Sequence, residues 1–372
     1  MNKVLLGDVA VEHKETCKGS KDGYPIVGLE HLIPEEITLT AWDEGSENTF
    51  SKMFRKGNVL FGRRRAYLKK AAVAPFDGIC SGDITVIEAK PDRILPELLP
   101  FIIQNDDLFD FAVGKSAGSL SPRVKWEHLK NYEFKLPDME KQKELAELLW
   151  AMDNTKKSYQ KLIAATDELV KSQFIERFGK PGTDPFGWGL TTLGECCELN
   201  PRKPKDMNTN IDYSFVAMPS VSEDGRIDSS IERPYSEVCK GFTYFGENDV
   251  LFAKITPCME NGKGGVAKKL KNGAGFGSTE FHVLRPIKGI SDPYWIYILT
   301  IFPKFRSDAE KVMTGTGGQR RVPITYLNEY PIALPPIDLQ EQFAAFVRQS
   351  DKSKFAALSC SNLNLWSCSG IP

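Results

Sequence analysis

The feature that most constrains the fold of this chain is a long internal repeat. The segment Leu129–Gln142 is matched without gaps, 198 residues later, by Leu327–Gln340. Shorter matches precede it in the same order: Leu6-Gly7-Asp8 with Leu193-Gly194-Glu195, Val59-Leu60-Phe61 with Val250-Leu251-Phe252, and Arg123-Val124 with Arg321-Val322. Solenoid repeats have periods of only roughly 20–50 residues. The repeat therefore predicts two whole domains of one design.

Length and composition agree with two domains and limit the function classes. A chain of 372 residues is too long for one ordinary core. The hydrophobic content of 41% and charged content of 26% are typical of soluble proteins. A net charge of −1 gives no global attraction to nucleic acid, so any polyanion site must be local. No apolar run approaches the ~18 residues of a membrane span, and the N-terminus lacks a signal-peptide core.

The cysteines also favour a cytoplasmic protein. Eight are scattered along the chain, without a C-x-x-C pair, and only Cys196 and Cys197 are adjacent. This spacing fits neither a zinc site nor a secreted disulfide framework. We therefore expect reduced thiols and a cytoplasmic location.

Each half of the chain reads as a mixed globule of strands and short helices. In the first half, residues 58–61 and 83–88 are strand-like between glycines, and residues 96–111 have helical spacing. In the second half, residues 249–254 and 280–285 are the corresponding strands, and residues 294–305 the corresponding helix. The expected fold class is α+β, with two similar domains.

A long helix is predicted between the two halves. From residue 140 to residue 178 there is no Pro or Gly, and apolar residues recur close to a heptad seam. Roughly 39 residues at ~1.5 Å each give a rod of about 58 Å. Such a stripe can pack on a globular core, but its position between two repeated domains favours a spacer.

A second helix is predicted after Pro336, with Phe343, Phe346 and Val347 on its apolar side. Two repeat-related helices of this kind would pair as an antiparallel coiled coil. No charge follows Lys354. We therefore expect a truncated second helix over residues 336–357 and an atypical uncharged tail over residues 358–372.

Known enzyme motifs are missing from the sequence. It contains no G-x-x-x-x-G-K-[ST] loop, no G-x-G-x-x-G between a strand and a helix, no H-E-x-x-H and no G-x-S-x-G. The four His show no metal-ligand spacing. One catalytic alternative stays open: Asp77 or Asp83, followed by Glu88 and Lys90, resembles the carboxylate set that holds a divalent metal in many nucleases. Otherwise we expect no catalytic or metal-binding residues.

Local basic clusters are the positive signal, because Arg and Lys can contact DNA phosphates and Arg can read guanine. One cluster follows a predicted strand, and the other is a Gly/Ser-rich loop ending in Arg; both recur in the second half. A charge run is often only a solvated surface, but recurrence in both halves favours binding. The candidate DNA-binding residues are Arg63, Arg64, Arg65, Lys69, Lys115, Ser119, Arg123 and Lys125 in the first half, and Lys254, Lys263, Lys268, Gln319, Arg320 and Arg321 in the second.

Taken together, the chain resembles the specificity subunit of a type I restriction–modification system. The resemblance covers about residues 4–357. It rests on the Leu-Pro…Gln segments at 136–142 and 334–340, Phe174–Gly179, the linker Lys180–Trp188 followed by Thr192–Glu195, and Gly318-Gln-Arg-Arg321.

The resemblance implies two target recognition domains, each reading one half of a split double-stranded DNA sequence, separated by an antiparallel coil of long helices. The corresponding division is 1–138 for the first recognition domain, 139–180 for the spacer helix, 181–335 for the second recognition domain and 336–357 for the second helix. It further implies two modification (methyltransferase) subunits using S-adenosylmethionine and a restriction subunit using ATP and Mg²⁺ as partners. The chain itself would be non-catalytic. A coiled-coil scaffold without a DNA role is the remaining alternative.

Overall fold

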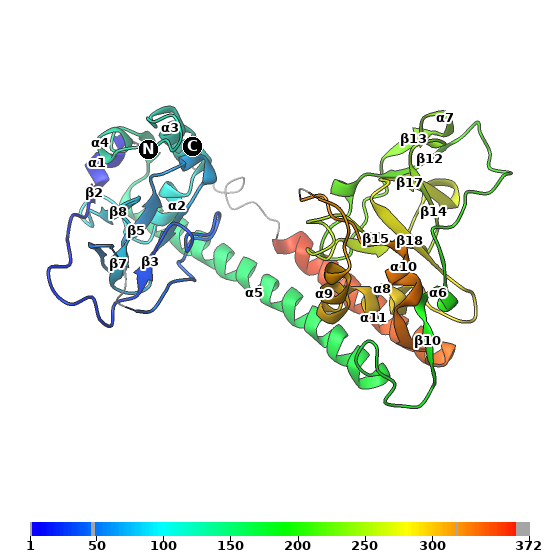
Figure 1. The fold of residues 1–372 in the computed structure, drawn as a ribbon. Helices are drawn as coiled ribbons and strands as arrows, with labels where there is room; N and C mark the ends of the chain where they lie inside the picture. Colours follow the sequence, from blue (N-terminus) through cyan, green and yellow to red (C-terminus); the bar gives the residue numbers. More distant parts are fainter. Residues whose placement is uncertain (1, 46–48, 317, 362–372) are drawn as a thin grey trace. The chain divides into compact units, whose positions relative to one another are not determined.

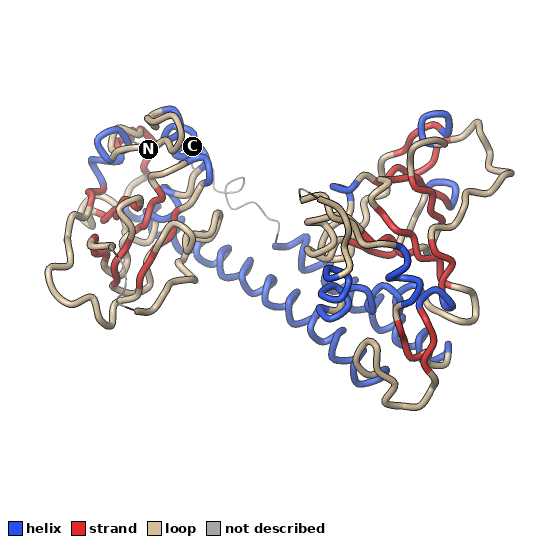
Figure 2. The backbone as a smooth tube through the Cα atoms, viewed as in Figure 1, coloured by secondary structure: helices blue, strands red, loops and turns tan. Residues whose placement is uncertain are grey.

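The computed structural model describes residues 2–45, 49–316 and 318–361. The chain divides into two compact units, one built from Met1–Gln160 and the other from Lys161–Leu358. Both contain strands and helices, as Figure 2 shows by colour. This confirms the predicted α+β class.

Unit 1 is organised around a four-stranded antiparallel sheet with the order β2-β8-β5-β6. A three-stranded sheet, β3-β7-β4, and the pair β1-β9 complete its strands. Figure 1 labels β2, β8 and β5 of the first sheet and β3 and β7 of the second. The strands are β1 (Asn2–Leu5), β2 (Ala10–Glu12), β3 (Ile26–Val27), β4 (Lys52–Phe54), β5 (Val59–Gly62), β6 (Ala71–Val73), β7 (Gly78–Cys80), β8 (Ile84–Ala89) and β9 (Glu133–Leu136). The helices are α1 (Leu6–Val9), η1 (Ala66–Leu68), α2 (Leu99–Ile103), α3 (Asp106–Gly114) and α4 (Trp126–Leu129).

Unit 2 repeats this plan. Its antiparallel sheet has the order β11-β18-β15-β16, and β10-β19 is the counterpart of β1-β9. The additional sheet has four strands, β13-β12-β17-β14. The strands are β10 (Leu190–Thr192), β11 (Cys197–Leu199), β12 (Asp212–Val216), β13 (Glu232–Pro234), β14 (Thr243–Gly246), β15 (Val250–Ala253), β16 (Gly264–Val266), β17 (Ala274–Gly277), β18 (Phe281–Pro286) and β19 (Pro331–Ala333). The helices are α6 (Leu193–Cys196), η2 (Met218–Ser220), α7 (Tyr235–Val238), η3 (Lys271–Gly273), α8 (Pro293–Ile301), α9 (Pro303–Lys311) and α10 (Ile324–Glu329).

The single helices predicted at 96–111 and 294–305 are each two helices. In unit 1 the chain breaks at Asn105, whose side chain accepts the backbone N–H of Asp107 and caps α3. In unit 2 it breaks before Pro303, because Pro cannot continue the helical hydrogen-bond pattern but fits the first turn of α9. The apolar spacing therefore identified helical regions but not the polar cap and the proline that divide them.

The long helix α5 (Met139–Phe178) confirms the prediction for the region between the two halves. Its first part packs into the core of unit 1 through Ala146 and Leu149, and its last part packs into the core of unit 2 through Phe174 and Phe178. Between Leu149 and Val170, only Asp153 is buried. The two ends of its apolar stripe therefore belong to globular cores, and the spacer role stays a prediction.

Within unit 2, α5 pairs with α11 (Ile337–Ser361) in antiparallel fashion (Figure 1). Phe178 and Phe343 lie with ring centroids 5.3 Å apart, and further along, Lys354 Nζ lies 2.7 Å from Asp167 Oδ1. Residue numbers rise along one helix as they fall along the other. The second helix continues past residue 357, and the uncharged tail predicted for residues 358–372 lies outside the described residues from 362 onward.

No helix among the described residues is both long enough and apolar enough to cross a membrane.

Candidate nucleic-acid interface

The two Arg-ending loops are held in the same way in the two units. In unit 1, Arg123 forms isolated β-bridges with Ala117 and Arg64, so the loop folds back on itself and onto the chain after β5. In unit 2, Arg321 forms the corresponding bridges with Thr314 and Ile255, after β15. A glycine allows each turn: Gly118 has φ +118 and Gly315 has φ +121, conformations that residues with a Cβ rarely adopt.

An ion pair fastens each loop to the start of a central strand. Arg123 donates from Nε to Asp83 Oδ1 at 2.7 Å and from Nη2 to Oδ2 at 3.3 Å. Arg321 donates from Nε and Nη2 to the two oxygens of Glu280, at 2.8 and 2.9 Å. Asp83 immediately precedes β8, and Glu280 immediately precedes the equivalent strand β18. We call these two ion pairs the arginine–carboxylate clamps.

The clamps keep their carboxylates ionised. Hydrogen bonds from Arg123 lower the pKa of Asp83, and hydrogen bonds from Arg321 lower the pKa of Glu280. In both units the backbone N–H of the carboxylate residue also donates to a serine hydroxyl two residues earlier, Ser81 or Ser278, at 3.2 Å. The local backbone and the distant arginine thus fix each carboxylate from two sides.

Around the framework that the two units share, the side chains differ. In unit 1, Arg64 approaches the clamp, with Nη2 3.0 Å from Ser121 Oγ and Nη1 3.5 Å from Asp83 Oδ2. Its counterpart in the bridge of unit 2 is Ile255. The backbone N–H of Arg65 donates to Pro122 O at 2.8 Å, and that of Thr256 donates to Arg320 O at 3.0 Å, so these two pairs also correspond.

Most of the other predicted residues lie around the clamps or on the same loops. Gln319 and Ser119 are exposed on the loops, Lys125 is exposed at the end of its loop, and Arg65 is exposed after β5. Arg320 Nη2 lies 3.4 Å from Glu310 and 3.6 Å from Glu260. Lys263 precedes β16 and accepts the N–H of Ala253 through its backbone carbonyl at 3.2 Å.

Three predicted residues have local roles away from the clamps. Lys69 pairs with Asp106 at 2.5 Å, and Lys115 lies 5.8 Å above the ring of Phe111. Lys268 hydrogen-bonds Asn248 and lies 5.4 Å from the ring centroid of Tyr294. The structure does not bring these three lysines to the clamp ion pairs.

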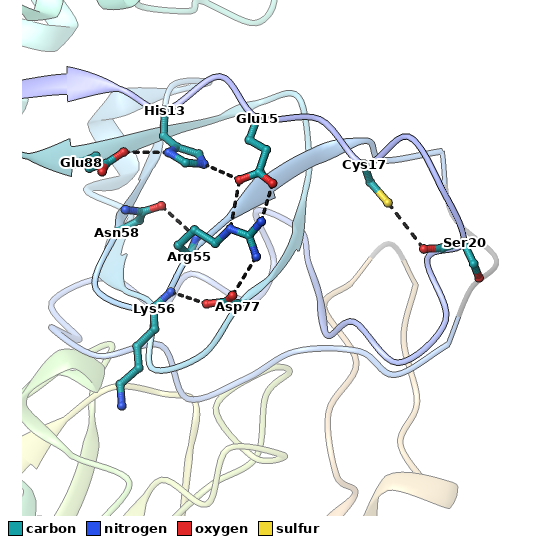
Figure 3. Close-up of polar contacts among 9 residues, drawn as sticks. All are labelled: His13, Glu15, Cys17, Ser20, Arg55, Lys56, Asn58, Asp77 and Glu88. Atoms are coloured by element: carbon teal, nitrogen blue, oxygen red, sulfur yellow. Dashed lines mark hydrogen bonds and ion pairs between the residues drawn. The ribbon is translucent and has the colours of Figure 1, made fainter.

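The carboxylates of the nuclease alternative are not gathered into one site. Asp83 belongs to the clamp, whereas Glu88 lies near the other end of β8 and binds His13 Nδ1 at 2.7 Å (Figure 3). Five residues along a strand separate two side chains by roughly 16 Å and point them to opposite faces. Lys90 instead donates to the backbone oxygen of Gly7 at 2.7 Å.

Asp77, the other carboxylate considered, is also engaged elsewhere. It accepts from Arg55 Nη1 and from the Lys56 backbone N–H, both at 2.8 Å, and Arg55 also binds Glu15 (Figure 3). The nuclease hypothesis therefore has no assembled carboxylate set, since each member is held by a different partner.

A group of one histidine and two acids in unit 1 also has an explanation without a metal. Ligand atoms of Glu30, His31 and Asp43 lie within 4.8 Å of one another. However, His31 Nδ1 accepts the Gly28 backbone N–H at 2.9 Å, so a neutral ring carries its proton on Nε2, which faces Asp43 at 3.5 Å. A metal-bound imidazole normally donates through its second nitrogen, which this contact prevents.

Sequence reasoning missed the carboxylate partners of the two loop arginines. Asp83 was considered only for the nuclease alternative, and Glu280 was not singled out. The available signal was positional: each acid follows a Ser by two residues and immediately precedes a repeated strand.

Comparison with known proteins agrees with the duplicated design. The family model described as "Type I restriction modification DNA specificity domain" matches residues 3–165 and again residues 185–359. The chain is 39% identical over 187 residues to the type I restriction enzyme EcoEI specificity subunit of Escherichia coli, a match that covers 47% of this chain and 31% of that protein. It is 39% identical over 165 residues to the EcoAI specificity subunit of Escherichia coli, covering 44% of this chain and 28% of that protein. The matched part thus spans about a third of the length of these relatives.

Solved structures show the same fold at low sequence identity. A type I restriction–modification system S subunit from M. genitalium matches with a TM-score of 0.55 and 12% identity, covering all of this chain and 96% of that one. A chain from a study of the assembly and conformational transition of the type I R-M system matches with a TM-score of 0.53 and 20% identity, covering 99% and 95%. Because the family model matches both halves of the sequence, this chain belongs to the type I restriction–modification DNA specificity family.

Proposed function

We propose that this chain is a DNA-sequence specificity subunit of a type I restriction–modification enzyme, in which unit 1 and unit 2 each read one half of a bipartite double-stranded target. The observation that carries the proposal is the duplicated clamp. In both units an Arg–carboxylate ion pair presents a Gly-containing loop with Ser, Gln or Arg side chains beside a basic strand end. Such side chains contact phosphates and base edges in DNA interfaces.

The proposal assigns chemistry to partner subunits. Two modification subunits would supply S-adenosylmethionine-dependent methyl transfer, and a restriction subunit would supply ATP- and Mg²⁺-dependent cleavage. This chain would contribute sequence recognition without a catalytic step, and as a reader of chromosomal DNA it would act in the cytoplasm. The different side chains around the two clamps, such as Arg64 in one and Ile255 in the other, suit domains that read different half-sites.

The test is to map methylated bases across the genome of cells that carry the gene together with its methyltransferase partner. We expect a single bipartite motif with an unspecified gap, and its loss when the gene is deleted. Methylation without any two-part motif, or methylation that survives the deletion, would contradict the proposal.

A specific control separates sequence recognition from a scaffold role. Combined replacement of Arg64, Gln319 and Arg320 by Ala should leave the chain bound to its methyltransferase partner but abolish the motif. A scaffold without a DNA role predicts that the same variant methylates the original motif.

A further inference from the structure

Arg63 and Lys254 occupy equivalent places in the two units. Arg63 directly follows the central strand β5, and Lys254 directly follows the equivalent strand β15. The Arg63 backbone N–H donates to Asp83 O at 3.0 Å, and the Lys254 backbone N–H donates to Glu280 O at 2.9 Å. Their carbonyls accept the N–H of Val124 and Val322, at 3.0 and 2.9 Å. The backbone of each cationic residue is thus fixed by two hydrogen bonds, one to the backbone of the clamp acid and one to the backbone of the residue after the clamp arginine.

The side chains of these two cations have no partner within the part of the chain that the structure describes. Among the described residues, no hydrogen bond or ion pair is formed by the guanidinium of Arg63 or the ammonium of Lys254, although the backbone of each residue is bonded to the backbone of a clamp acid. Those carboxylates are already bound by Arg123 and Arg321. This distinguishes the pair from Lys69 and Arg320, which are both ion-paired.

Partial burial makes the missing partner costly. Arg63 Nε is buried and has no hydrogen-bond partner among the described residues, as is also the case for Arg64 Nε. Burial also lowers the pKa of the Lys254 ammonium, since nothing in the clamp fully compensates its lost hydration. The charge of each side chain therefore has no compensating group on the protein side among the described residues, which leaves its exposed donor atoms available to an outside acceptor.

The exchange of Arg for Lys between the two units favours a phosphate as the acceptor. Arg presents a planar fork of donors, whereas Lys is a compact point charge, so the two are not interchangeable where a base edge must be read by two parallel hydrogen bonds. A phosphate oxygen accepts either one. The neighbouring positions are not matched in charge, since Arg64 corresponds to Ile255 and Arg65 to Thr256. What the two units share at this place is therefore charge alone.

We propose that Arg63 and Lys254 are equivalent phosphate anchors, each donating to a backbone phosphate of the half-site bound by its unit. The inference rests on the proposed DNA-reading function and adds a division of roles. The clamps position the loops, the anchors bind the sugar–phosphate backbone regardless of sequence, and the neighbouring side chains that differ between units read the bases.

The experiment measures DNA affinity as a function of salt for the full chain purified with its methyltransferase partner. Two duplexes are used, one with the mapped bipartite motif and one of unrelated sequence. The variants are Arg63→Gln and Lys254→Gln. The matched controls are Arg93→Gln, whose guanidinium is exposed and pairs with the adjacent Asp92, and Lys304→Gln, whose side chain pairs with Asp308 on α9.

Each anchor variant should reduce the slope of log affinity against log salt by about 1, because one fewer phosphate is neutralised. Affinity for the two duplexes should fall by the same factor, so the preference for the motif stays unchanged. Arg63→Lys and Lys254→Arg should keep the wild-type slope, since only charge is needed. The two control variants should also keep it.

Two outcomes would overturn the anchor proposal. In one, wild type binds the motif but Arg63→Gln and Lys254→Gln keep the wild-type salt slope. In the other, these variants lose preference for the motif, which would make the residues base readers. If instead wild type shows no salt-dependent DNA binding and no bipartite motif, the proposed function itself fails. Thermal unfolding of every variant shows whether a lost affinity reflects lost folding.

Discussion

At the scale of single residues, Asp83 and Glu280 decide what the neighbouring arginines can do. A guanidinium held by two hydrogen bonds to a carboxylate has little freedom to follow a DNA base, but it holds its own backbone in place. Arg123 and Arg321 were predicted to contact DNA directly. The clamp geometry favours a positioning role for both, with base reading left to their neighbours.

Removing a clamp carboxylate should weaken discrimination but not DNA binding in general. Asp83→Asn or Glu280→Gln deletes a negative charge near the proposed interface, so affinity for unrelated duplex at low salt should rise. The loop loses a partly exposed ion pair of ~1 kcal/mol, so preference for the motif should fall about 5-fold. Competition binding with motif and unrelated duplexes measures both effects. Equal losses on the two duplexes would show that the carboxylates do not set loop geometry.

His282 should make the stability of unit 2 depend on pH. Its Nε2 lies 2.8 Å from Val322 O, and burial lowers its pKa to about 4. Because the ordinary pKa is 6.5, the unfolded chain takes up a proton between pH 6.5 and pH 4 that the folded chain does not. The free energy of unfolding should therefore fall as pH falls through this window, by about 3 kcal/mol in total.

Urea unfolding at pH 7 and pH 5 tests this expectation. His282→Gln keeps a donor toward Val322 and an acceptor toward Asn200 but cannot titrate, so its loss of stability between the two pH values should be smaller than that of wild type. His128→Gln, at an exposed position, is the matched control. An equal pH dependence in wild type and His282→Gln would contradict the role given to this ring.

At the scale of elements, one buried glutamine fixes the start of each long helix. Gln142 Oε1 accepts the Leu95 N–H at 2.8 Å, and Gln340 Oε1 accepts the Asp292 N–H at 3.0 Å. The side-chain amides donate to Pro137 O and Pro335 O, at 2.9 and 2.8 Å. The repeated Leu-Pro…Gln segment therefore encodes a joint between each helix and the domain before it.

Breaking this joint should be costly although the glutamine is far from the clamps. Gln340→Leu has a similar volume but leaves the Asp292 N–H and the Pro335 and Ile290 carbonyls without their partner, at roughly 1–3 kcal/mol for each buried group. We expect a fall of at least about 3 kcal/mol in the free energy of unfolding of unit 2. Chemical denaturation measures it, with Gln342→Leu on the exposed side of α11 as control. Similar stabilities for the two variants would show that the buried bonds contribute little.

At the scale of the whole molecule, duplication means that each unit should be alterable without the other. Arg64→Ala with Arg65→Ala changes only side chains of unit 1, and Gln319→Ala with Arg320→Ala changes only side chains of unit 2. Each double variant should relax one half of the methylated motif and leave the other half intact. A lost bidentate base contact costs about 1–3 kcal/mol, so the relaxed positions should be readily visible in a methylation map. Relaxation of both halves by one double variant would contradict independent reading.

The sequence by itself determined the two-copy plan, the α+β class, the long helix and the regions that carry basic loops. Each of these depends on patterns within a short stretch or on repetition of one stretch by another. The sequence did not determine which cations are free, because the partner of Arg123 lies 40 residues earlier and that of Arg321 lies 41 residues earlier. Only the pairing of β5 with β8 and of β15 with β18 brings those carboxylates to the loops. Tertiary structure therefore decided the roles within the basic clusters, because a charge already paired inside the protein is held differently from one that still lacks a partner.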